Sequence, residues 1–202
     1  MPDYMLSKLT RTIVIVGFIG LSGGCQSPVK GLTPTASDAK VLDVLIQLAK
    51  RGAPALCSPQ AIEQALQVSI EASPVRRSVV ANSTTESQTA DISPRPGQSL
   101  WQRGRYEHFT SQALDKCSVW LRVSWPRLCE NVWSHMEAST KDPGHRWPAY
   151  HGAAPSPWRI WRFAPDGSPP NLPYSEWSML QLHPRPDPDG ACIAEVELRS
   201  RS

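Results

Sequence analysis

Apolar residues recur at helical spacing in the first third of the chain. In the segment 37–52 they lie three and four positions apart, with Ser37 as a helix cap and Gly52 as a stop. A second helix is predicted to begin at Ser58 and Pro59, a favoured helix start. The two apolar faces comprise Val41, Leu42, Leu45, Leu48 and Ala49, and then Ala61, Ile62, Ala65 and Leu66. We expect both faces to pack into a core.

In the second half, apolar and polar residues alternate, which predicts half-buried strands. The clearest segment is 117–125 ("CSVWLRVSW"), which places Trp125 on the apolar face and Trp120 on the polar face. Further strands are predicted from Trp158, Glu176 and Ala191, and a short helix over 128–137. The predicted fold class is therefore α+β: an N-terminal helix pair followed by a mainly antiparallel β half rich in tryptophan and proline.

The beginning of the chain has a different pattern. Lys8 and Arg11 precede nine largely apolar residues, 13–21, and the small residues 22–24 lead to Cys25. Spanning a bilayer takes about 20 apolar residues, whereas the apolar part of an export signal has about 7–15. The segment is therefore interpreted as an export signal.

Its end, "LSGGC", resembles the lipobox of bacterial lipoproteins, with Leu21 four rather than three residues before Cys25. The resemblance implies that the Cys25 thiol receives a lipid and that Cys25 becomes the new N-terminus. The protein would then be anchored in a bacterial membrane and face the periplasm or the cell surface. Gln26 favours the outer over the inner membrane. The alternatives are an ordinary cleaved signal and a short uncleaved anchor.

Four cysteines remain after Cys25: Cys57, Cys117, Cys129 and Cys192. An even number in an exported chain favours two disulfides, and the sequence leaves all three pairings open. Cys117 and Cys192 both begin predicted strands, which makes a bridge between them conceivable. No closely spaced cysteine pair is present, so neither a metal site nor a cofactor is expected.

These patterns divide the chain into five segments. The polar segment 76–99 separates the helices from the strands and is predicted to be a linker or a mobile loop. The predicted organisation is a signal peptide (1–24), a tether (25–36), a helical segment (37–75), this linker (76–99) and a β-rich domain (100–202).

Charge and motifs exclude several functions. The formal net charge of +3 is too small to indicate nucleic-acid binding. The five histidines show no metal-binding spacing, and neither a G-x-S-x-G motif nor a phosphate-binding loop occurs. No catalytic residue is therefore assigned, and a non-enzymatic function is favoured.

All eight tryptophans lie between residues 101 and 177. We expect most of them to fill a core that is poor in aliphatic residues. Those expected to be exposed are Trp120, Trp147 and Trp161, which would form a platform for stacking on sugar rings. His145 lies in the polar and aromatic segment 142–152, where a ligand site is most expected.

The resulting hypothesis is a lipid-anchored protein of the bacterial envelope with a structural or interaction role. Its partners would be the membrane and another envelope protein, and it would be accessory to a trans-envelope assembly. The main alternative is a glycan- or peptidoglycan-binding module that uses exposed tryptophans. A hydrolase of envelope polymers is the least supported alternative.

Overall fold

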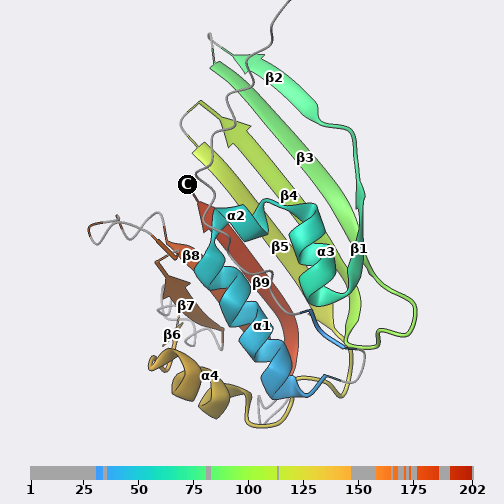
Figure 1. Ribbon diagram of the computed structural model, residues 1–202, viewed down its shortest axis with the longest axis vertical. Helices are drawn as coiled ribbons and strands as arrows, with labels where there is room; N and C mark the ends of the chain where they lie inside the picture. Colours follow the sequence, from blue (N-terminus) through green and yellow to red (C-terminus); the bar gives the residue numbers. More distant parts are fainter. Residues whose placement is uncertain are drawn as a thin grey trace, which may run out of the picture.

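The fold is described from a computed structural model (Figure 1). It describes residues 31–33, 36–80, 83–112, 114–146, 158–164, 166–167, 171, 173, 177–186 and 192–201. The predicted signal peptide, most of the tether with Cys25, and Trp147 lie outside these residues. None of the described helices is long and apolar enough to cross a membrane.

The helices begin and end at the predicted signals. The Ser37 side chain accepts a hydrogen bond from the Lys40 N–H (3.3 Å), and Ser58 caps the third helix in the same way through Ala61. Gly52, with φ of 64°, ends the first helix. The four described helices are α1 (Asp38–Arg51), α2 (Ala53–Leu56), α3 (Pro59–Leu66) and α4 (Val132–Thr140).

The described strands form one sheet in which every pairing is antiparallel. They are β1 (Val68–Ala72), β2 (Arg76–Val80), β3 (Ser83–Pro94), β4 (Trp101–Ser111), β5 (Leu114–Val123), β6 (His145–Arg146), β7 (Arg159–Phe163), β8 (Ser178–Pro184) and β9 (Ile193–Arg201). Their order is β1-β3-β4-β5-β9-β8-β7-β6, and β2 also pairs with β3. The combination of helices with a mainly antiparallel sheet confirms the predicted α+β class.

The helices α1, α2 and α3 lie over one face of the sheet, and α4 lies next to α1 at its lower end, as Figure 1 shows. Along β5, Val119, Leu121 and Val123 are fully buried, whereas Trp120 and Arg122 between them are half-buried. This alternation places the core between the helices and one sheet face. We call the opposite face, on which the described residues form no helix, the open face.

Residues 76–99 are not a linker. They contain β2 and all of β3, and β3 pairs with β1, β2 and β4. Ala90 and Ile92 of β3 belong to the core, with 3% and 2% of their surface exposed. The sequence of this segment did not reveal a strand because few of its residues face the core, although threonine, which occurs three times in β3, favours strands. The predicted helical segment 37–75 likewise ends in a strand, β1.

Two further expectations about the β half were incomplete or wrong. The strand β4 was not predicted, although it pairs along most of its length with β3 and β5. Trp125 was expected in the core but is 62% exposed. The strand ends at Val123, so the alternation that assigned Trp125 to the apolar face no longer applies. Its ring instead lies 5.3 Å from the guanidinium carbon of Arg185.

The four described cysteines form two disulfides, as predicted. Cys57–Cys117 joins the end of α2 to β5, and Cys129–Cys192 joins the segment after β5 to the residue before β9. The conceivable Cys117–Cys192 pairing does not form. Because β5 and β9 are antiparallel, Cys117 lies opposite Ser200, at the far end of β9 from Cys192.

Candidate binding site on the open face

A row of charged side chains crosses three strands of the open face. The register places Arg122 of β5 opposite Glu195 of β9, and Glu195 opposite His183 of β8. Residues opposite each other on neighbouring strands lie on the same face, within interaction distance. The sheet therefore brings together a guanidinium, a carboxylate and an imidazole from positions up to 73 residues apart.

Hydrogen bonds and ion pairs centre on the Glu195 carboxylate. It accepts hydrogen bonds from Trp120 Nε1 (3.3 Å) and from Arg122 Nη2 (3.4 Å). His183 Nδ1 lies 3.9 Å from Glu195 Oε2. The Glu195 side chain is 26% exposed, so it remains accessible to a ligand. We call Trp120, Arg122, Trp158, His183 and Glu195 the Glu195 cluster.

Trp158 adds an aromatic surface to the cluster. Its ring stacks on the His183 ring with 4.2 Å between centroids, and 40% of Trp158 is exposed. Burial lowers the pKa of His183, and the nearby Glu195 and Glu197 carboxylates only partly oppose this effect. The imidazole is therefore neutral at neutral pH. Its buried Nε2 has no hydrogen-bond partner among the described residues.

The cluster combines the groups that recognise a polar ligand with an apolar face. Trp158 offers a flat ring for stacking, while the Glu195 carboxylate accepts and the Arg122 guanidinium donates hydrogen bonds. Binding sites of this kind pair aromatic surface with a few convergent polar groups. Sugar rings present hydroxyls at their edges and C–H bonds on their faces, and they fit this chemistry.

The predicted ligand residues do not come together. Trp120 belongs to the Glu195 cluster, but Trp161 is only 1% exposed and stacks on Trp133 of α4. Its exposure was predicted wrongly, because β7 points this residue toward the core. His145 is exposed on β6, with three strands between it and Trp120 of β5. Trp147 lies outside the described residues.

Sequence reasoning missed Arg122, Trp158, His183 and Glu195. The alternation along "CSVWLRVSW" does place Arg122 on the same face as Trp120. Which strand lies beside β5, however, depends on the sheet order. The C-terminal strand β9 inserts between β5 and β8, and no local pattern in the sequence indicates this neighbour.

Two other histidines, His108 and His135, each contact both a carboxylate and a hydroxyl without forming a catalytic triad. His108 Nε2 contacts both Asp115 Oδ1 (2.7 Å) and Thr110 Oγ1 (3.1 Å). His135 Nε2 likewise contacts Asp43 Oδ1 (2.8 Å) as well as Ser139. A triad holds the carboxylate on one ring nitrogen and the nucleophile on the other. Here one nitrogen serves both groups, so neither set activates its hydroxyl.

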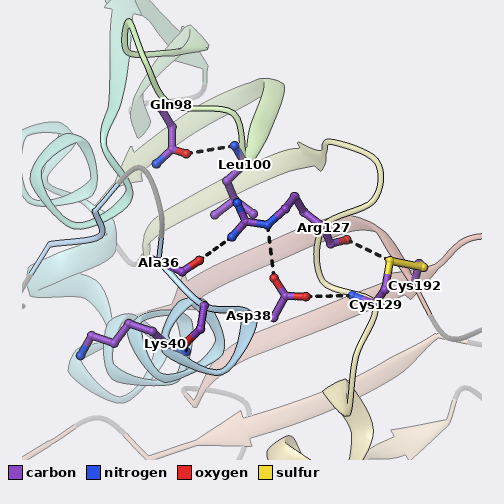
Figure 2. Close-up of polar contacts among 9 residues, drawn as sticks. Ala36, Asp38, Lys40, Gln98, Leu100, Arg127, Cys129 and Cys192 are labelled. Carbon is purple, nitrogen blue, oxygen red and sulfur yellow. Dashed lines mark hydrogen bonds and ion pairs between the residues drawn. A yellow bond between two sulfur atoms is a disulfide. The ribbon is translucent and has the colours of Figure 1, made fainter.

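A cavity of about 470 Å³ lies at the beginning of α1, lined by Asp38, Arg127 and His135 among others. Figure 2 shows that two of its polar side chains, Asp38 and Arg127, are already paired: Asp38 accepts from Arg127 Nε (3.3 Å) and from the Cys129 N–H (3.1 Å). Arg127 also donates to the Ala36 carbonyl. With the adjacent Cys129–Cys192 disulfide, this arrangement connects α1 to the segment after β5. It is a structural junction.

The fold and the site define an α+β protein with helices on one sheet face and an aromatic, charged cluster on the other. Comparison with protein-family models, curated proteins and solved structures finds no match.

Proposed function

We propose that the protein is a lipid-anchored component of the bacterial envelope that binds a saccharide through the Glu195 cluster. The observation that carries this proposal is the stacked Trp158–His183 pair beside the hydrogen-bonded Glu195 and Arg122. The proposed role is binding, and neither the His108 set nor the His135 set described above has the arrangement of a catalytic triad.

The location is inferred from the beginning of the chain. The basic residues, the apolar run and "LSGGC" resemble a lipoprotein signal, which implies lipid attachment at Cys25 and, with Gln26, the outer membrane. The Cys57–Cys117 and Cys129–Cys192 disulfides support this proposal because disulfides persist mainly in oxidising compartments outside the cytoplasm.

In the proposed complex, one sugar ring lies against the exposed part of Trp158. Its hydroxyls donate to Glu195 and accept from Arg122. The hydrogen bonds from Trp120 and Arg122 hold the carboxylate in place before the ligand binds, which reduces the entropy lost on binding. Stacking between two aromatic rings contributes about 0.5–1.5 kcal/mol. We expect a similar gain for one sugar ring on Trp158, so affinity for a single sugar should be weak and should rise with saccharide length.

Co-sedimentation with purified peptidoglycan, and titration with N-acetylglucosamine oligomers followed by tryptophan fluorescence, test the saccharide proposal. Trp158→Ala and Glu195→Gln are expected to abolish most binding. Phe109→Ala is the matched control, since Phe109 is 37% exposed and lies on the open face opposite Lys116. Wild-type protein that binds neither ligand, or equal losses in Phe109→Ala and Trp158→Ala, contradicts the proposal.

The anchor is tested separately. Cells producing the wild-type chain and the Cys25→Ser variant are fed a labelled fatty acid and then fractionated. We expect label and membrane association in the wild type and the loss of both in the variant. Equal membrane association of the two forms, or no label in the wild type, contradicts lipid attachment.

A second candidate function is contact with another envelope protein through the sheet edge. Among the described strands, β2 pairs only with β3, and it carries Val79, which is 67% exposed; Val75 just before it is 54% exposed. An edge strand with exposed apolar residues is a place where an extended segment of a partner adds a strand. Val79→Lys is expected to remove a partner captured from membranes by cross-linking without changing peptidoglycan binding.

A further inference from the structure

The Cys57–Cys117 disulfide lies within a group of four residues that carry metal-type ligands. The ligand atoms of Cys57, His108, Asp115 and Cys117 are all within 4.8 Å of one another. The fold dictates this grouping. His108 of β4 lies directly opposite Cys117 of β5, and Asp115 precedes Cys117 by two residues and so points to the same face. Cys57, at the end of α2, approaches from the helical layer.

The donor set is one that Zn²⁺ accepts. Two thiolates, one imidazole and one carboxylate make a four-coordinate tetrahedral site, in which ligand atoms are roughly 3.3–3.8 Å apart. Separations within 4.8 Å therefore need only small movements. The His108 and Asp115 side chains are 28% and 43% exposed, which leaves a path for the ion to enter.

Neighbouring groups are placed to support the sulfur atoms. The Tyr106 hydroxyl donates to Cys117 Sγ (3.9 Å), and Ser200 Oγ lies 3.6 Å from Cys57 Sγ. Hydrogen bonds to ligand atoms orient the ligands and stabilise thiolate charge. The other disulfide, Cys129–Cys192, has no such grouping of histidine and carboxylate among the described residues.

We propose that Cys57 and Cys117 form a redox-controlled zinc site, which holds either a disulfide or a Zn²⁺ ion. A protein dithiol of the thioredoxin class attacks Cys57 Sγ, because Cys57 is half-buried whereas Cys117 is fully buried. A mixed disulfide forms on Cys57 and Cys117 leaves as the thiolate. The second thiol of the reductant then releases Cys57, and the reductant becomes a disulfide.

Zn²⁺ then binds the two sulfurs together with His108 Nε2 and an Asp115 oxygen, displacing the protons of the reduced thiols. Both states connect α2 to β5, so reduction followed by zinc binding leaves the helical layer attached to the sheet. The disulfide state cannot bind the ion through its sulfurs. The protein thus acquires zinc only under reducing conditions.

Cobalt binding tests this proposal, because thiolate-bound Co²⁺ gives intense charge-transfer absorption and tetrahedral Co²⁺ gives characteristic visible bands. The probe is Co²⁺ added to the full chain with Cys25→Ser, purified in detergent, before and after reduction with a phosphine. We expect one equivalent to bind to the reduced protein only, and Zn²⁺ to displace it. His108→Ala is expected to weaken binding more than about tenfold.

The matched control is Cys129→Ser with Cys192→Ser, which removes the other disulfide and is expected to keep the cobalt spectrum. Near-ultraviolet circular dichroism records whether the reduced chain is folded and whether the metal restores folding. If the reduced protein shows no thiolate–cobalt absorption, the proposal is overturned, whether or not the reduced protein is folded. An unchanged spectrum in Cys57→Ser with Cys117→Ser overturns it as well.

Discussion

At the scale of single residues, the surroundings decide what each tryptophan does. Trp101 is 2% exposed and donates its N–H to the Leu66 carbonyl (3.0 Å), which satisfies its polar atom inside the core. Trp161 is also buried, whereas Trp125 and Trp158 are exposed. Alternation placed Trp120 on the polar face but misjudged Trp125, because Trp125 lies beyond the end of β5 at Val123.

Trp161→Ala is expected to lower the free energy of unfolding by about 3–5 kcal/mol, because it leaves a cavity where the ring packs against Trp133. Urea unfolding followed by circular dichroism measures this loss. Trp125→Ala is the control, with an expected loss of about 1 kcal/mol or less because the ring is exposed and only its contact with Arg185 is removed. Equal losses in the two variants would contradict the burial of Trp161.

His183 is expected to make folding sensitive to mild acid. Burial lowers its pKa in the folded protein below the usual value of 6.5. The unfolded chain therefore binds a proton more readily, and stability falls as the pH drops below about 6.5. The decrease in the free energy of unfolding from pH 7.5 to pH 5 should be smaller in His183→Gln than in the wild type. A variant that shows the same acid-induced loss as the wild type would refute the contribution of His183.

At the scale of elements, local signals are enough to form the helices but do not say where they dock. Ser37, Ser58 and Gly52 act within a few residues of themselves, and the sequence reveals them directly. The Asp38 carboxylate lies in the first turn of α1 and also binds Arg127 and the Cys129 N–H, about 90 residues away. This contact connects α1 to the segment after β5.

Asp38→Ala is expected to destabilise the protein by about 1–3 kcal/mol, since it leaves the Cys129 N–H and the Arg127 guanidinium without their carboxylate. A double-mutant cycle with Arg127→Leu, measured by urea unfolding, should give a coupling energy of about 0.5–3 kcal/mol. Lys40→Ala serves as the control in the same turn of α1. The Lys40 contact with Ser37 is made by the backbone N–H, which the alanine variant keeps. Strictly additive losses for Asp38 and Arg127 would mean that the two side chains act independently.

At the scale of the whole molecule, the sheet unites parts of the sequence that composition separates. The polar segment 76–99 supplies β2 and β3. The strand β3 pairs with one edge of β4, and β5 pairs with the other edge. The last strand, β9, pairs with β5 and β8 in the middle of the sheet. The predicted boundary at 76–99 therefore falls inside the sheet.

Replacing residues 74–99 by a short glycine–serine segment is expected to prevent cooperative folding. The deletion removes Ala90 and Ile92 from the core and leaves β4 as an unprotected edge. Thermal unfolding followed by circular dichroism, together with solubility, measures the outcome. Replacing only the turn residues 96–97, which lie outside the strands, is the matched control and should keep the transition. A soluble deletion variant with a sharp transition would show that the segment is dispensable.

By itself, the sequence determined the features that depend on neighbours along the chain. These are the helix caps at Ser37 and Ser58, the alternation of β5 and the predicted class of antiparallel strands with helices. The predicted disulfide chemistry needed only the number of cysteines. Lipid attachment at Cys25 remains a prediction from the sequence, since that residue lies outside the described part of the structure.

Only the tertiary structure decided which strands are neighbours, which cysteines pair and which tryptophans are buried. Arg122, His183 and Glu195 meet because β9 lies between β5 and β8. Each pairing in a sheet depends on the free energy of the whole assembly, and a change of one residue in register would turn every side chain of a strand to the other face. The Glu195 cluster and the group of residues around Cys57–Cys117 therefore form only because the whole sheet has this strand order and register.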